Sequence, residues 1–205
     1  MPRSAGGAKL PAMFEVRIHG RGGQGVVTAA EMLSIAAFRE GRDAQAFPSF
    51  GSERTGAPVV AFCRIDEAEI RLREPIMNPD ALIVQDPTLL HQVDVFSGLK
   101  PEGYLLINSS RTFAELGLAD FVAARPAERG LTVPATDLAR RHVGRPIPNA
   151  ALLGGFAAMS GLISLRSLGA ALLEKFPPPV AEANLAAAKE AFEFVEREVR
   201  ELARA

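Results

Sequence analysis

Residues 19–28 read His19-Gly20-Arg21-Gly22-Gly23-Gln24-Gly25-Val26-Val27-Thr28, and this glycine-rich stretch decides the fold. Residues 14–18 before it alternate apolar and charged side chains, as a strand does. Residues 29–38 after it carry Ala29, Met32, Leu33, Ala36 and Ala37 at the spacing of one helical face, and Gly41 predicts the end of that helix. The predicted order is therefore strand, glycine loop, helix.

The glycines at the ends of this loop fit the spacing G-x-G-x-x-G, with Gly20, Gly22 and Gly25 in the three positions. Their missing side chains allow a tight turn, the close approach of a phosphate, and close packing of helix on strand. Free N–H groups at the start of the helix offer donors and partial positive charge to an anion. A turn of this kind also serves purely structural purposes, so the motif alone leaves both interpretations open.

The loop after the predicted second strand separates two classes of cofactor. A dinucleotide fold carries an acidic residue about 20 residues beyond the glycines, at the end of the second strand. Asp43 instead lies at the beginning of the predicted strand at 43–47. The following loop, residues 47–56, offers Ser52, Arg54, Thr55 and Gly56. Hydroxyl groups and an arginine suit a phosphate better than a ribose diol, which weakens the alternative of a stand-alone dinucleotide-binding dehydrogenase.

The rest of the chain predicts one α/β domain. Buried strands are predicted at residues 81–85, 104–108 and 131–135, and helices at 150–163, 165–176 and 180–198. Residues 59–65 and 69–73 predict an antiparallel hairpin inserted after the second strand. We therefore expect a Rossmann-like, mostly parallel sheet flanked by helices, with an antiparallel strand insertion. Residues 14–205 form the domain, and residues 1–13 are predicted to be disordered.

Three predicted strands end in small or polar residues, at Gly20, Asp86 and Asn108. The carboxyl ends of parallel strands share one edge of a sheet, where open α/β sheets bind ligands. Asp86 precedes Pro87, so we expect it to cap a short helix, and orienting a ligand is the alternative role. His19, beside the glycines, is a candidate ligand contact.

Composition excludes several classes of function. The chain has 205 residues and a net charge of −1, which makes nucleic acid an unsuitable partner. No apolar run reaches the roughly 20 residues of a membrane span, so we expect a cytoplasmic protein. Cys63 is the only cysteine, and the three histidines lack the spacing of a metal site. We therefore expect no metal site, and no motif of paired carboxylates, catalytic serine or P-loop lysine indicates a catalytic residue.

Four segments together resemble the gamma subunit of 2-oxoacid:ferredoxin oxidoreductases, the pyruvate and 2-ketoisovalerate synthases. They are residues 20–28, 47–56, 84–90 and 148–154. The resemblance runs from about residue 14 to about residue 196 and identifies residues 14–205 as a single gamma-type catalytic domain of that family.

The resemblance implies oxidative decarboxylation of a 2-oxoacid with coenzyme A to acyl-CoA, or the reverse reaction. It also implies alpha, beta and delta subunits as partners, with ferredoxin reached through the complex. Thiamine diphosphate, magnesium and [4Fe-4S] clusters then belong to those partners, and this chain contributes assembly surface and part of the coenzyme A site. A related indolepyruvate enzyme and a purely structural subunit stay open as alternatives.

Coenzyme A offers a pyrophosphate to the glycine loop and a 3′-phosphate to an arginine such as Arg54. The predicted site residues are Gly20, Arg21, Gly22, Gly23, Gln24, Gly25, Thr28, Ser52, Arg54, Thr55 and Gly56.

Overall fold

The computed structural model describes residues 13–49 and 55–204. The disorder predicted for the N-terminus falls outside these residues except at Met13, where the first strand begins. Two predicted site residues, Ser52 and Arg54, also lie outside the described residues.

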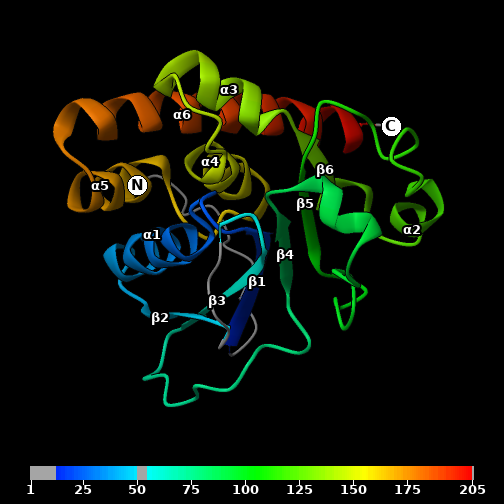
Figure 1. Cartoon of the computed structure of the whole chain (residues 1–205). Coiled ribbons are helices and arrows are strands. Elements are labelled where there is room, and N and C mark those ends of the chain that lie inside the picture. Colours follow the sequence, from blue (N-terminus) through cyan, green and yellow to red (C-terminus); the bar gives the residue numbers. More distant parts are fainter. Residues whose placement is uncertain (1–12, 50–54, 205) are drawn as a thin grey trace, which may run out of the picture.

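A six-stranded sheet with the order β2-β3-β1-β4-β5-β6 forms the centre of the chain (Figure 1). Its strands are β1 (Met13–Arg21), β2 (Asp43–Pro48), β3 (Pro58–Asp66), β4 (Ala81–Val84), β5 (Tyr104–Asn108) and β6 (Gly130–Val133). Strands β1, β4, β5 and β6 run parallel, whereas β3 is antiparallel to both β1 and β2. The predicted fold class, a mostly parallel sheet with an antiparallel insertion, is therefore confirmed.

The antiparallel pairing involves different segments from those predicted. Strand β3 pairs with β2, and residues 69–73 form no strand, so the predicted hairpin partner of β3 was wrong. Two side chains satisfy the backbone of that segment without a ladder. The Ile70 amide donates to the Asp43 carboxylate at 2.6 Å, and the Arg64 guanidinium donates to the Leu72 carbonyl at 3.3 Å.

Helices cover the two faces of the sheet unequally. The helices are α1 (Val26–Arg39), α2 (Ala119–Ala123), α3 (Ala135–Val143), α4 (Asn149–Ser160), α5 (Leu165–Lys175) and α6 (Pro178–Leu202), with 3₁₀ turns η1 (Pro87–His91) and η2 (Ala127–Arg129). Figure 1 shows α1, α3, α4, α5 and α6 gathered on one side of the strands and α2 apart from them. Among the described residues, no helix combines the length and apolar character needed to cross a bilayer.

Helix α1 presents the face that its sequence predicts. Ala29, Met32, Leu33, Ala36 and Ala37 are all buried in the larger core cluster, which they share with residues of β1, α4 and α5. This burial holds α1 against the sheet, so its N-terminus stays at the end of β1.

Helix α4 is buried on all sides, and Gly154 explains how closely it packs. A Cβ atom at Gly154 would lie 2.0 Å from the carbonyl oxygen of Ala188 in α6. Only glycine fits at this contact. This contact holds α4 close against α6.

The carboxyl ends of β1, β4 and β5 lie along one edge of the sheet, as predicted. Gly20 and Arg21 are the last residues of β1, Asn108 ends β5, and Asp86 follows β4 by two positions. Helices α1 and α3 begin at the same edge because they follow β1 and β6. Helix α4 begins there too, since its first residue, Asn149, contacts Gly25. This edge therefore gathers the glycine loop and several helix N-termini.

Candidate functional site

The glycine loop joins β1 to α1 with a backbone that only glycine adopts comfortably. Gly25, the N-cap of α1, has φ of 70°, and Gly23 in the turn has φ of 91°. Gly20 is needed for space, because a Cβ there would lie 2.6 Å from Cγ2 of Val26. Gly25 therefore serves tight turning and Gly20 close helix–strand packing, as the motif predicts.

The loop between β2 and β3 is hydrogen-bonded to the glycine loop at its described end, residues 55–57. The Gly22 amide donates to the Ala57 carbonyl at 2.9 Å, and the Gly56 amide donates to the Gly22 carbonyl at 3.0 Å. Gly22 and Thr55 also form an isolated parallel bridge. The structure thus brings together the predicted site residues of two segments that lie about 30 residues apart in the chain.

The first turn of α1 is left open. Gly25 provides no side-chain cap, and the first turn holds no acidic residue. Within the described residues, the N–H groups of Val26, Val27 and Thr28 have no acceptor outside the helix. Gly23 is exposed beside them. Donors without an acceptor among the described residues, together with the positive end of the helix dipole, make this turn a candidate binding place for an anion.

Arg21, which the sequence placed among the ligand contacts, makes four side-chain hydrogen bonds to the protein. Its Nε donates to Asp86 at 3.1 Å, and one terminal nitrogen donates to the Gly56 carbonyl at 3.0 Å. The other donates to Thr88 at 2.8 Å and to Gln92 at 2.7 Å. In this structure Arg21 therefore joins the glycine loop to the loop between β2 and β3 and to η1.

Asp86 is confirmed as the cap of η1, because its Oδ1 accepts from the Thr88 amide at 2.9 Å and from the Thr88 hydroxyl at 2.6 Å. Its Oδ2 accepts from Arg21 and, at 2.8 Å, from the side-chain amide of Gln24. Burial opposes ionisation, yet the hydrogen bonds from Thr88 and Gln24 and the charge of Arg21 hold the pKa of Asp86 below its ordinary value. Four donors occupy this carboxylate.

Asn149 is a site residue that sequence reasoning did not select, although it lies in the segment 148–154 that carries the resemblance. Its Nδ2 donates to the Gly25 carbonyl at 3.3 Å, across 124 positions of the chain. A Cβ at Gly25 would lie 2.5 Å from the same nitrogen. The start of α4 therefore packs against the start of α1, a contact that no local pattern indicates.

Gln85 lies under the glycine loop and is almost completely buried, with 1% of its surface exposed. Its Cβ lies 3.2 Å from the position that a Cβ would take at Gly20. Neither atom of its side-chain amide has a hydrogen-bond partner among the described residues. Unpaired polar atoms at this depth are uncommon and concentrate at functional sites.

His19, the candidate ligand contact, lies in the core. Side chains alternate along β1, so His19 points to the sheet face opposite Ile18 and α1. Burial first, and the charge of Arg17 second, lower the pKa of His19 to about 4. The imidazole is therefore neutral at physiological pH, and its position does not face the open turn of α1.

The thiol of Cys63 is buried, and burial raises its pKa. No group of three or more His, Cys, Asp or Glu residues within the described ranges is arranged to hold a metal ion.

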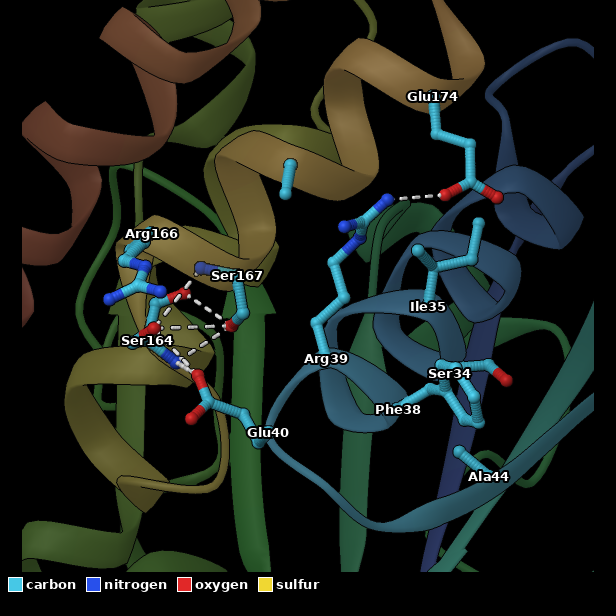
Figure 2. A pocket seen from close by; sticks show the side chains of 11 residues that line it. Ser34, Ile35, Phe38, Arg39, Glu40, Ala44, Ser164, Arg166, Ser167 and Glu174 are labelled. Carbon is cyan, nitrogen blue, oxygen red and sulfur yellow. Dashed lines mark hydrogen bonds and ion pairs between the residues drawn. The ribbon is translucent and has the colours of Figure 1, made fainter.

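A hollow of about 800 Å³ lies between α1 and α5 (Figure 2). The N-terminus of α5 lines it, but this terminus is closed by Ser164 and Ser167, which form a capping box. Glu40 accepts from the Ser164 hydroxyl at 2.6 Å and brings a negative charge. Serine hydrogen bonds, from Ser164 first and then Ser167, lower the pKa of Glu40. Arg39, Arg166 and Glu174 also line this hollow, so its charge is mixed, and the cap already occupies the start of α5. The hollow therefore differs from the uncapped start of α1.

The sheet order argues against the dinucleotide alternative. In a dinucleotide fold the second strand lies parallel to the first and carries the ribose-binding acid near the glycines. Here antiparallel β3 lies next to β1, and β2 lies beyond it. No acidic residue at the end of β2 can reach the glycine loop, because that strand ends in Phe47 and Pro48.

Comparisons with known proteins show which proteins the chain is similar to. The sequence profile of the family described as pyruvate ferredoxin/flavodoxin oxidoreductase matches residues 15–194. Pyruvate synthase subunit PorC of Methanothermobacter thermautotrophicus is 46% identical over 185 residues, which cover 90% of this chain and 97% of that protein. The pyruvate/ketoisovalerate oxidoreductases common subunit gamma of Thermococcus kodakarensis is 47% identical over 180 residues, covering 88% and 96%.

A solved structure shows the same arrangement. The crystal structure of pyruvate oxidoreductase subunit PORC from Thermotoga maritima is similar with a TM-score of 0.73 and 34% identity, covering 89% of this chain and 97% of that chain.

Proposed function

Because the chain belongs to the pyruvate ferredoxin/flavodoxin oxidoreductase family, as the gamma-type subunit of a 2-oxoacid:ferredoxin oxidoreductase, we propose that its glycine loop forms part of the coenzyme A site. In this proposal the first turn of α1 receives the pyrophosphate. The loop at residues 52–56, with Arg54, receives the 3′-phosphate. Coenzyme A supplies the thiol that accepts the acyl group.

The open first turn of α1 is the observation that carries the proposal. Val26, Val27 and Thr28 offer N–H donors without an acceptor among the described residues, and no carboxylate stands in that turn. The exposed Gly23 has no side chain to keep a phosphate away. A diphosphate matches this donor set in charge and in its number of acceptor oxygens. The residues present therefore fit the group.

The neighbouring groups hold the turn in shape rather than take part in chemistry. Arg21 is engaged by the protein, Asp86 has its four donors, and His19 is neutral and faces the opposite side of the sheet. In this proposal Arg21 and Asp86 hold the glycine loop in place and take no part in the reaction. Oxidation and decarboxylation then take place elsewhere in the assembly.

Complexes of this family use thiamine diphosphate and iron–sulfur clusters, and the chain is one subunit of such a multi-subunit oxidoreductase. In the proposal, thiamine diphosphate, magnesium and the [4Fe-4S] clusters lie in alpha, beta and delta subunits. A single cysteine in 205 residues supports that division, because a cluster needs several thiolates. Ferredoxin would then be reduced by the complex and not by this chain.

The test adds one negative charge to the open turn. Thr28→Glu places a carboxylate where helices favour one, so it should not destabilise the fold, but it should repel a diphosphate. In the assembled complex we expect the KM for coenzyme A to rise about fivefold, equivalent to about 1 kcal/mol, while kcat changes little. Thr28→Gln has the same shape without the charge, and should behave as the unmodified complex does. An unchanged KM in Thr28→Glu would contradict the proposal.

A further inference from the structure

We propose that Asp86 is a positioning residue that holds the glycine loop in the shape required for coenzyme A, a role that rests on the proposed function of that loop. The carboxylate touches no ligand in this account. It acts through Gln24 and Arg21, the two loop residues that donate to it.

The geometry around Oδ2 carries the inference. Arg21 Nε and Gln24 Nε2 both donate to this oxygen, at 3.1 and 2.8 Å. Gln24 also closes its own turn, because its Oε1 accepts from the Arg21 amide at 2.8 Å while its backbone amide donates to the Arg21 carbonyl at 3.0 Å. The turn from Arg21 to Gln24 is therefore closed by two hydrogen bonds between these residues, and both side chains also donate to Asp86.

Through Arg21, Asp86 also acts on the loop between β2 and β3. Arg21 donates to the Gly56 carbonyl at 3.0 Å, and Gly56 in turn donates to Gly22. Since Asp86 is one of the four acceptors that orient the guanidinium, the carboxylate helps to place Gly56 relative to the glycine loop. Only 13% of its side-chain surface is exposed, so water competes weakly for these hydrogen bonds.

A direct role for Asp86 in binding is excluded by its saturation. Thr88 occupies Oδ1 twice, and Arg21 and Gln24 occupy Oδ2. A negative charge next to a diphosphate would also repel it unless neutralised, and Arg21 provides that neutralisation. The carboxylate therefore serves the loop and not the ligand.

Asp80, at the other end of β4, provides a matched control. Its side chain is 12% exposed, and it also accepts from a backbone amide and a cation, namely Glu15 N at 3.0 Å and Lys100 Nζ at 2.8 Å. It lies at the amino end of the strand, away from the glycine loop. Both aspartates are therefore largely buried and accept from a backbone amide and a cation, but only Asp86 also binds side chains of the glycine loop.

The experiment compares Asp86→Asn with Asp80→Asn in the assembled complex. Asparagine still caps η1, because it is a good N-cap, but its amide nitrogen turns a donor towards the donors of Arg21 and Gln24. We expect Asp86→Asn to raise the KM for coenzyme A about tenfold, with kcat and the KM for the 2-oxoacid within about twofold of the unmodified values. Asp80→Asn should leave all three parameters within the same twofold limit.

The outcomes separate this inference from the proposed function. If Thr28→Glu raises the KM for coenzyme A and Asp86→Asn does not, the positioning role is overturned and the proposed function stands. If neither variant changes that KM, both are overturned. An equal rise in Asp80→Asn would indicate general loosening of the fold and would also overturn the positioning role.

Gln24→Leu serves as a second variant where Asp86→Asn fails to assemble. It removes the side-chain hydrogen bonds of Gln24 and leaves the cap of η1 intact, and it should raise the KM for coenzyme A without lowering kcat. An unchanged KM in this variant would overturn the inference.

Discussion

The N-termini of α1 and α5 are two helix starts of the same chain with opposite chemistry. Helix α5 begins at Ser164 with a capping box, and Glu40 adds a carboxylate to it. Helix α1 begins at Gly25 with no side-chain cap and no acid in its first turn. Both helices have more than ten residues, so both carry the positive end of a full dipole.

The difference suggests that the start of α5 has a structural role and the start of α1 a binding role. The cap satisfies some of the N–H groups at the start of α5, and the Glu40 carboxylate there opposes an anion. An uncapped terminus leaves its N–H groups available to a ligand. The capped start of α5 joins two helices, since Glu40 follows α1. The uncapped start of α1 lies at the carboxyl edge of the sheet, where open α/β sheets bind ligands.

The largest expected effect comes from crowding the start of α1. Gly25→Ala would place a Cβ 2.5 Å from Asn149 at a φ of 70°, and we expect a loss of about 3 kcal/mol in the free energy of unfolding. Gly161→Ala, near the start of α5, meets the same backbone strain at φ of 63° but no atom within 4 Å. It should cost about 1 kcal/mol. Denaturant unfolding of the two purified variants measures both values, and equal losses would contradict the close α1–α4 contact.

A smaller effect is expected from Arg54, which lies outside the described residues. Arg54→Ala should raise the KM of the complex for coenzyme A about tenfold, because a charge-assisted hydrogen bond to the 3′-phosphate is lost. Dephospho-coenzyme A lacks that phosphate and provides the control. The variant and the unmodified complex should have the same KM for it. A tenfold difference with both substrates would assign Arg54 another role.

The smallest effect concerns pH at the start of α5. Hydrogen bonds from Ser164 and then Ser167 lower the pKa of Glu40 from its ordinary 4.5. A lowered pKa in the folded state means that Glu40 stabilises the fold fully above pH 4.5, and that this contribution fades as the pH falls through the lowered value. The stability advantage over Glu40→Gln should therefore shrink on acidification. Glu174→Gln, which removes an exposed ion pair with Arg39, is the matched control, and an advantage of Glu40 that is constant with pH would contradict the assignment.

Local patterns predicted much of this arrangement. The buried face of α1, the structural roles of Gly20 and Gly25, and the cap at Asp86 all depend on residues within a few positions of one another, and each was confirmed. The pairing of residues 69–73 was predicted wrongly, because Asp43 and Arg64 satisfy that backbone from distant positions.

The contacts that complete the site were beyond sequence reasoning. Asn149 reaches Gly25 across 124 positions, and Asp86 reaches Gln24 across 62. Such contacts depend on how the helices pack, and packing leaves no periodic signal in the chain. For the same reason Arg21 was predicted to contact the ligand, whereas in the fold its side chain donates to Asp86, Thr88 and Gln92.

The most direct test is a cryo-electron microscopy map of the assembled complex with coenzyme A bound. We expect diphosphate oxygens at about 3 Å from the backbone nitrogens at the start of α1, with the start of α5 free of ligand. A diphosphate bound elsewhere, with the glycine loop packed against a partner subunit, would contradict this expectation and identify the loop as purely structural.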